Sequence, residues 1–259
     1  MNVTVNSVRI DAGGLHYREL NQRLRAAVTG GANRIELENV AGQRYIGTNL
    51  HGAASPDDLA RLEIEITGTP GNDLGAFLDG PTITVRGNVM DGAGNTMNRG
   101  RIVAHGRAGD ITGFSARGGE IFIKGNAGYR AGIHMKEFES MRPVMVIGGT
   151  AQDFLGEYMA GGVVIVLGLT LKQGESHYAS HVGTGMHGGV IYIRGEIGEA
   201  QVSEAVGISD VPGEESAMLC SYVYEYARLF NTEVSDISPE EFVRLTPRTA
   251  RPYQQLYAY

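Results

Sequence analysis

The chain has 259 residues, a formal net charge of −7 and 38 glycines, about twice the usual glycine share of roughly 7%. Only 8 prolines and a hydrophobic content of 42% exclude the collagen-like and disordered classes as the source of this glycine. The negative charge argues against binding of nucleic acid through its phosphates. The single cysteine excludes internal disulfides and any four-cysteine zinc or iron–sulfur site held by this chain alone.

The first 59 residues are expected to form an N-terminal helix and capping segment. Residues 16–28 have the apolar spacing of a helix, which ends at Gly30, and residues 34–40 alternate as a strand does. The N-terminus lacks the basic and apolar regions of a secretion signal, and no apolar run approaches the ~18 residues of a membrane span. We therefore expect a cytoplasmic protein with no membrane contact.

From residue 60 onward, short aliphatic runs end in glycines at a fixed spacing. The first four lie 19 residues apart, and the pattern continues with insertions: Gly68, Gly87, Gly106, Gly125, Gly149, Gly168 and Gly195. A second glycine follows each of several corners, at Gly75, Gly94, Gly113, Gly132 and Gly156, and further glycines precede the next run. Because glycine adopts positive φ without steric cost, these positions are interpreted as the corners of a repeating coil.

The positions four and two before each corner glycine form one face of a strand. All but Ala104 are larger aliphatic or methionine side chains: Ile64, Ile66, Ile83, Val85, Ile102, Ile121, Ile123, Met145, Ile147, Val164, Val166, Ile191 and Ile193. One strand per 19 residues leaves no room for a crossover helix, so each strand must pair with its equivalent in the next coil. The sequence predicts an all-β fold over residues 60–200: a right-handed parallel β-helix, a single-stranded solenoid of about seven coils, with flanking N- and C-terminal helices.

The opposite strand face changes character along the chain. Its residues are polar in the first two coils and apolar afterwards: Glu65, Thr84, Val103, Phe122, Val146, Ile165 and Tyr192. A solvated face would stay polar, so something covers this one. We favour the terminal segments of the chain over a partner protein, because terminal segments often cap solenoids.

Residues 201–259 are expected to form a helical C-terminal extension and tail. A tyrosine-rich helix is predicted at Glu214–Phe230, and Ser238-Pro239-Glu240-Glu241 carries the capping signals of another short helix. The last nine residues, 251–259, contain three tyrosines without periodicity. This tail either docks on the body or reaches a neighbouring molecule, and a homo-oligomer is therefore possible.

Two patterns resemble binding motifs but have simpler interpretations. Residues 183–188 match G-x-G-x-x-G, yet they precede a strand, whereas a dinucleotide fingerprint precedes a helix. His177, His181 and His187 gather in one insertion, but its glycines disfavour the helix that would bring the first two together. An exposed or interfacial loop is favoured over a metal site, and this insertion or the C-terminal tail could form a partner interface.

Asp91 and Asp110 occupy the same position in successive coils and should be neighbours. Paired acids on a β-helix could bind calcium or hydrolyse a polysaccharide. Turn formation is the favoured role, because Tyr129 breaks the series in the next coil. Cys220 lies in an apolar stretch and is expected to be a buried structural thiol. The residues show no catalytic constellation, so no catalytic, cofactor-binding or metal-binding residue is predicted in this chain.

The coil motifs resemble a known family. TGTPGNDLGAFL (67–78), GEYMAGGVVIVLG (156–168) and GMHGGVIYIRG (185–195) are similar to the GXGXG domain of the glutamate synthase large subunit, and AGQRYIGTNLHG (41–52) resembles the segment before its first coil. The resemblance spans roughly residues 34–200. Stand-alone copies belong to enzymes like N-methylglutamate synthase, and the chain is also similar to a related β-helix, the β-helical subunit of formylmethanofuran dehydrogenase.

The resemblance implies a non-catalytic structural subunit of a multisubunit oxidoreductase in glutamate biosynthesis and nitrogen metabolism. Its partners would be an amidotransferase subunit that releases ammonia from glutamine and a subunit that holds FMN and an iron–sulfur cluster. This chain would hold no cofactor itself. Two alternatives stay open: the corresponding β-helical part of a formylmethanofuran dehydrogenase or formyltransferase complex, and a carbohydrate-active β-helix enzyme that uses Asp91 and Asp110.

Overall fold

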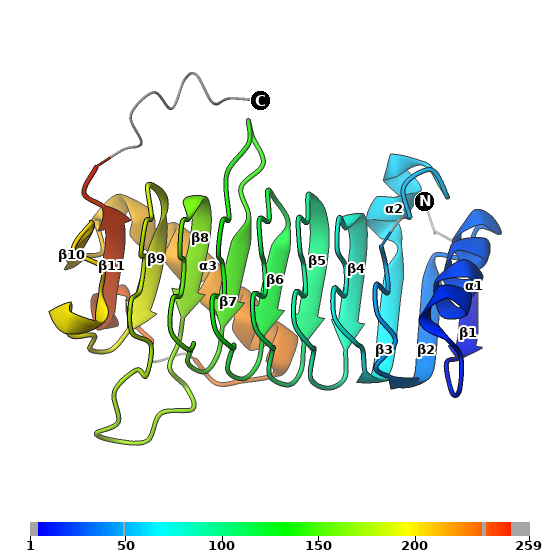
Figure 1. Ribbon diagram of the computed structural model, residues 1–259, viewed down its shortest axis with the longest axis horizontal. Helices are drawn as coiled ribbons and strands as arrows, with labels where there is room; N and C mark the ends of the chain where they lie inside the picture. The colour runs from blue at the N-terminus through cyan, green and yellow to red at the C-terminus, as the bar shows by residue number, and fades with distance from the viewer. Residues whose placement is uncertain (1–4, 49, 235–236, 250–259) are drawn as a thin grey trace.

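A computed structural model describes residues 5–48, 50–234 and 237–249. In the described part of the chain, nine strands pair in parallel with one another in chain order: β1 (Ser7–Asp11), β2 (Arg34–Ala41), β3 (Glu63–Thr69), β4 (Asp79–Val85), β5 (Arg99–Ala104), β6 (Glu120–Ile123), β7 (Val144–Ile147), β8 (Ala160–Val166) and β9 (Gly188–Arg194). Two more strands, β10 (Val206–Asp210) and β11 (Phe242–Pro247), pair antiparallel. Together they form one sheet in the order β1-β2-β3-β4-β5-β6-β7-β8-β9-β11-β10 (Figure 1). The expectation of a mostly β fold with flanking helices is confirmed.

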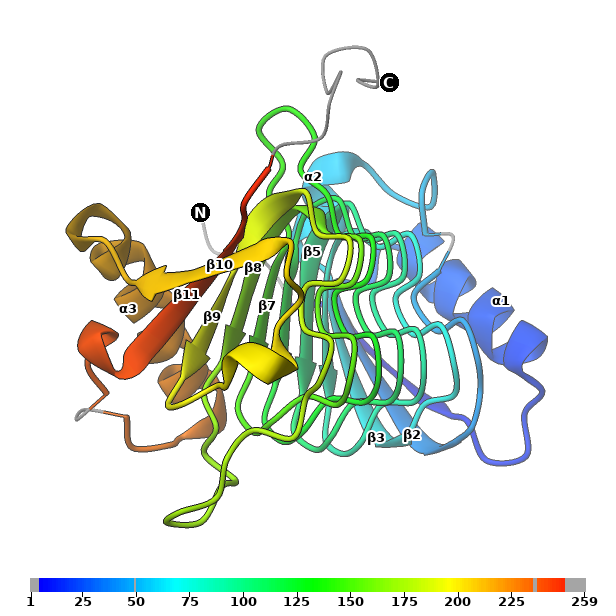
Figure 2. The same cartoon turned by 60° about the vertical axis from the view of Figure 1, so that its left-hand side comes forward.

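Equivalent residues of successive strands lie side by side, as the 19-residue spacing predicts. Ile83 pairs with Ile102, and Ile102 pairs with Ile121. The loops between the strands are also joined to each other, because the amide of Gly94 donates to the carbonyl of Leu74 at 2.8 Å. Figure 2 shows the loops of successive strands following one another along the sheet. The division of the chain at residues 60 and 200 stays a prediction, and the sheet runs across both positions.

The predicted inner strand face is confirmed as the core. Each of its members, including Ala104, is buried. Helix α1 (Tyr17–Thr29) adds Leu20, Leu24 and Val28 to this cluster from beside β1. A short unpredicted helix, α2 (Pro56–Arg61), is capped by Ser55, whose hydroxyl accepts a hydrogen bond from the amide of Asp58 at 3.2 Å. Within the described ranges, no helix combines the length and the apolar character needed to cross a bilayer.

The apolar part of the outer face is covered by helix α3 (Gly213–Phe230), which lies behind the strands in Figure 1. The buried residues that β5 to β9 contribute to this layer are Val103, Phe122, Val144, Val146, Val163, Ile165, Val190 and Tyr192, and α3 contributes Leu219, Val223, Tyr226 and Phe230. The prediction of a helix at 214–230 is confirmed. The expectation that the chain's own C-terminal segment covers this face is confirmed with it.

Polar contacts fix the position of α3 on the sheet. The Tyr226 hydroxyl donates to the carbonyl of Lys124 at 2.9 Å, and Arg101 of β5 pairs with Glu225 at 2.5 Å. At the start of the helix, Glu215 accepts two hydrogen bonds from Arg244 of β11, at 2.7 and 2.9 Å, and one from the Tyr192 hydroxyl. Because these groups lie on β5, β9 and β11, the helix is held at both ends.

The C-terminal extension differs from the prediction after α3. The capping box at 238–241 is present, since the Ser238 amide donates to a Glu241 carboxylate oxygen at 2.9 Å. It starts the single 3₁₀ turn η2 (Pro239–Glu241), and strand β11 follows directly. A similar turn, η1 (Glu199–Gln201), precedes β10. Strand β11 inserts between β9 and β10, which the sequence analysis did not predict. The prediction for residues 251–259 falls outside the described residues.

Four of the seven first glycines have a different role from the one expected, whereas Gly68, Gly168 and Gly195 do adopt positive φ. The second glycines, such as Gly94 at φ +72°, do turn through positive φ, but Gly87, Gly106, Gly125 and Gly149 do not. These corner positions instead lie against the preceding turn: a Cβ on Gly106 would approach the side-chain oxygen of Asn88 to 2.2 Å. The interpretation as positive-φ corners is therefore wrong for these four glycines. They are needed because neighbouring turns approach closely.

The stability of the α3 layer is expected to fall in strong alkali. Burial raises the pKa of Tyr226 to about 12, from an ordinary value of 10.0. Because the folded pKa lies above the unfolded one, this stabilisation is complete below pH 10 and is lost as the pH rises through about 12. We expect the free energy of unfolding, measured from pH 9 to 12, to fall less steeply in Tyr226→Phe than in the wild type. Equal slopes would show that this hydroxyl does not resist ionisation.

Candidate functional site

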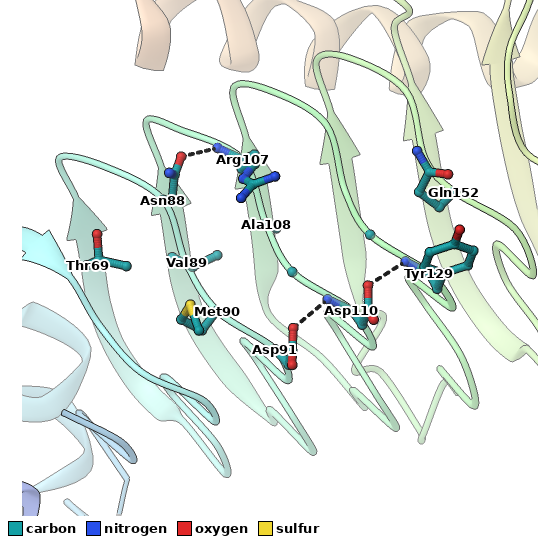
Figure 3. A pocket seen from close by; sticks show the side chains of 12 residues that line it. Thr69, Asn88, Val89, Met90, Asp91, Arg107, Ala108, Asp110, Tyr129 and Gln152 are labelled. Atoms are coloured by element: carbon teal, nitrogen blue, oxygen red, sulfur yellow. Dashed lines mark hydrogen bonds between the residues drawn. The ribbon is translucent and has the colours of Figure 1, made fainter. Parts of the chain in front are cut away.

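A shallow concavity of about 630 Å³ lies along five successive turns on the loop side of the sheet (Figure 3). Small residues line the bottom of this concavity and leave it hollow, among them Ala108, Gly109 and Gly128. Met90 and Tyr129 stand at its sides and are 45% and 46% exposed. The other lining residues are Thr69, Asn88, Val89, Asp91, Arg107, Asp110 and Gln152. This surface combines carboxylates, amides, a guanidinium and exposed apolar side chains.

Asp91 and Asp110 lie on adjacent turns, as the spacing predicts, and each is tied to the next turn. Asp91 Oδ1 accepts the amide of Asp110 at 2.9 Å, and Asp110 Oδ1 accepts the amide of Tyr129 at 2.9 Å (Figure 3). The glycine before each donor is required, because a Cβ on Gly109 or Gly128 would lie 2.4 or 2.2 Å from that same oxygen. These bonds confirm the expectation that the two aspartates act in turn formation.

Two asparagines accept the same kind of hydrogen bond from the next turn, and neither was predicted to do so. Asn88 Oδ1 accepts the amide of Arg107 at 3.0 Å, and Asn126 Oδ1 accepts the amide of Thr150 at 3.0 Å. Each asparagine directly follows a corner glycine, and each donor follows the glycine of the next turn. This recurrence was visible in the repeat, and it identifies a second row of side-chain bonds between turns.

Removing the Asp110 carboxylate tests this structural role. Asp110→Ala is expected to lower the free energy of unfolding by about 1 kcal/mol, the usual net contribution of one hydrogen bond. Asp110→Asn keeps the accepting oxygen and should lose much less. Urea unfolding of both variants measures the difference. Equal losses in the two variants would show that the bond to the Tyr129 amide does not stabilise the turn.

The three histidines of the insertion do not share a site. His177 is buried, and its Nε2 lies 2.8 Å from the carbonyl of Arg194, while burial lowers the pKa of its ring. His181 stacks on Phe154 at 5.0 Å, and His187 Nδ1 lies 3.1 Å from the Gly185 carbonyl. Among the described residues, no group of three or more His, Cys, Asp or Glu side chains is placed to hold a metal ion. An interfacial role for this insertion stays a prediction.

The remaining sequence patterns have structural explanations. Gly183 and Gly185 adopt positive φ in the loop before β9, so the G-x-G-x-x-G match precedes a strand, as expected. Cys220 is only half-buried on α3, so the expectation of a buried structural thiol is wrong in its burial. Leu219, the residue before it, is buried against the sheet. Because most of the residues around Cys220 are apolar, the sequence does not show which of them face the sheet.

The sequence has relatives of two kinds. It is 42% identical over 260 residues to an uncharacterized protein of Methanocaldococcus jannaschii, and the alignment covers 98% of this chain and 97% of that protein. It is 32% identical over 174 residues to ferredoxin-dependent glutamate synthase 2 of Synechocystis sp., and the alignment covers 60% of this chain and 10% of that protein. It is 30% identical over 191 residues to the ferredoxin-dependent glutamate synthase of Pyropia yezoensis, and the alignment covers 69% of this chain and 11% of that protein. The chain therefore spans about a tenth of the length of these glutamate synthases.

The fold has a counterpart among solved structures. A chain of the formyltransferase/hydrolase complex from Methylorubrum extorquens, solved in complex with methylofuran, superposes with a TM-score of 0.59. The match covers 87% of this chain and 90% of that chain at 20% identity, so it shows a shared fold. The model of the GXGXG motif family matches residues 17–248, which is most of the sequence. This protein belongs to the GXGXG-motif family.

Proposed function

We propose that this chain is a non-catalytic structural subunit of a multisubunit oxidoreductase of the glutamate synthase or N-methylglutamate synthase type. One observation carries the proposal. The sequence matches about a tenth of the glutamate synthases, but nearly the whole length of the Methanocaldococcus jannaschii protein. A module that is joined to catalytic parts in some proteins thus occurs as a chain of similar length to this one in another. Such a module is expected to work beside separate catalytic subunits.

We infer that the stacked turns form a right-handed parallel β-helix. Hydrogen bonds between successive loops, such as Gly113 N to Ala93 O at 2.7 Å, support this, together with the parallel register of the strands. Right-handed winding is the general preference for parallel crossover connections. A rod of this kind has a rigid outer surface, because each turn is bonded to the next along strands and loops alike. Rigidity suits a subunit that positions others.

The chemistry of the complex is assigned to its other subunits. We propose an amidotransferase subunit and a subunit with FMN and an iron–sulfur cluster as the partners, in a cytoplasmic complex. This chain has one cysteine, on α3, and so cannot by itself supply the four thiolates of a typical cluster. Its contribution is to dock and orient these subunits.

Native purification tests the proposal. An affinity tag on this chain, expressed at its natural level, is expected to recover an amidotransferase and an FMN protein in fixed stoichiometry, identified by mass spectrometry. Formyl-transferring partners would instead support the alternative of a β-helical subunit in a formylmethanofuran dehydrogenase or formyltransferase complex. A chain that elutes alone or only as a homo-oligomer, by light scattering at several concentrations, would contradict both roles.

The carbohydrate-active alternative is tested separately on the isolated protein. The concavity contains Asp91 and Asp110, and each has one carboxylate oxygen bonded to a backbone amide. Turnover of a polysaccharide in the presence of calcium, lost in Asp110→Asn, would favour this alternative. We expect no turnover, because both aspartates already have a structural role.

A further inference from the structure

Aromatic side chains form a row on the loops of neighbouring turns. The rings of Phe114 and His134 meet edge to face at 5.8 Å, and His134 stacks on Tyr158 at 5.2 Å with an interplanar angle of 15°. His134 is exposed, and Tyr158 is 46% exposed. Their backbones have φ of +56° and +52°, where a residue with a side chain costs about 1–2 kcal/mol more than glycine. The next turn places Gly185 against the Tyr158 ring at φ +67°.

Two cations stand beside this row. Arg117 and Lys136 occupy equivalent places in adjacent turns: the Arg117 amide bonds to the carbonyl of Met97 at 2.8 Å, and the Lys136 amide bonds to that of Ala116 at 3.0 Å. Both side chains are exposed. Two like charges therefore lie on adjacent turns at this surface.

The nearby acids do not form ion pairs with these cations. Glu137 pairs with Arg142 at 2.8 Å, and Glu157 pairs with Arg130 at 2.9 Å. Neither Arg117 nor Lys136 forms an ion pair with any residue in the described part of the chain. Outside that part the sequence contains a single acidic residue, Asp236.

Stacking between turns explains part of this arrangement, but it does not explain the cations. Ring contacts stabilise neighbouring turns, whereas two exposed cations without ion pairs contribute nothing comparable to stability. The whole chain has a net charge of −7, so this exposed pair of cations is opposite in sign to the net charge of the protein. Charge of this kind gives an interface its specificity and steers an oppositely charged partner towards it.

We propose that Phe114, Arg117, His134, Lys136 and Tyr158, called here the aromatic–basic row, dock an acidic segment with aromatic side chains on a partner protein. The guanidinium and ammonium groups would pair with its carboxylates, and the exposed edges of the His134 and Tyr158 rings would contact its rings edge to face. The proposal deepens the proposed function and rests on it, since it names the surface through which this subunit holds another.

The first test uses the isolated full chain and defined probes. Random glutamate–tyrosine copolymer is titrated into isotopically labelled protein and followed by NMR, with polylysine of equal length as the opposite charge. We expect saturable shifts at the aromatic–basic row, at least tenfold weaker binding in Arg117→Glu/Lys136→Glu, and weakening with added salt. Arg18→Glu/Lys172→Glu has the same change in net charge on α1 and in the insertion, and should bind as the wild type does. Thermal unfolding verifies that both double variants are folded.

Several results would overturn the proposal. Shifts that map elsewhere, or equal weakening by the control pair, would show that binding follows net charge alone. Tighter binding of a single-stranded oligonucleotide through the same five residues would assign the row to nucleic acid rather than to a protein partner.

The second test uses the natively purified complex. If Arg117→Glu/Lys136→Glu leaves the complex intact at all salt concentrations, the row is not the docking surface, although the proposed function stands. If no complex is recovered and yet the copolymer binds at the row, the proposed function fails and the binding surface stands.

Discussion

Gly68→Ala is expected to lower the free energy of unfolding by more than about 4 kcal/mol, or to prevent folding altogether. Gly68 lies in β3 with φ +122°, a region that residues with side chains rarely adopt. A Cβ there would lie 2.1 Å from the carbonyl oxygen of Val40 in the neighbouring strand. Because the obstacle is backbone within a paired ladder, neither strand can move aside without breaking hydrogen bonds.

A second glycine separates the steric effect from the conformational one. Gly174 also has positive φ, at +83°, but a Cβ there would meet nothing within 4 Å. Gly174→Ala should therefore lose only about 1–2 kcal/mol, the cost of the backbone conformation. Urea unfolding of both variants measures the two effects. Similar losses would mean that strands β2 and β3 do not approach as closely as the structure places them.

The inner face of the sheet could be predicted because its signal is local and periodic. Ile83, Ile102 and Ile121 recur at one spacing, and alternation within each strand shows which side chains share a face. The adjacency of Asp91 and Asp110 follows from the same arithmetic. No tertiary information was needed once the repeat was found.

Other features depend on contacts between distant segments. The roles of Gly87 and Gly106 were misread because a close approach to the previous turn leaves the same sequence signal as a positive φ. The apolar outer face predicted a cover, but the insertion of β11 between β9 and β10 has no local signature. The concavity was missed because it depends on where Met90 and Tyr129 stand relative to small residues in other turns.

Phe122→Ala is expected to lower the free energy of unfolding by about 3–5 kcal/mol, as for a fully buried phenylalanine. Phe122 is 0% exposed, although it lies on the face of β6 opposite to the inner core. The Arg101 guanidinium lies over its ring, 5.4 Å from the centroid, and also pairs with Glu225 of α3. The truncation would leave a cavity in the layer that holds the helix. Amide hydrogen exchange in α3 should therefore become faster than exchange in β2 and β3.

The same ladder position two turns earlier supplies the matched control. Thr84 is half-buried on the polar part of the outer face, next in register to Glu65 and Val103. Thr84→Ala should change the free energy of unfolding by no more than about 0.5 kcal/mol, as surface substitutions usually do. A loss of unfolding free energy that is several-fold larger in Phe122→Ala than in Thr84→Ala would show that the contact with α3 supplies the stabilisation, since both residues take part in the same strand pairing. Equal small losses would mean that α3 does not rest on the sheet, and the apolar outer face would then be free for a partner.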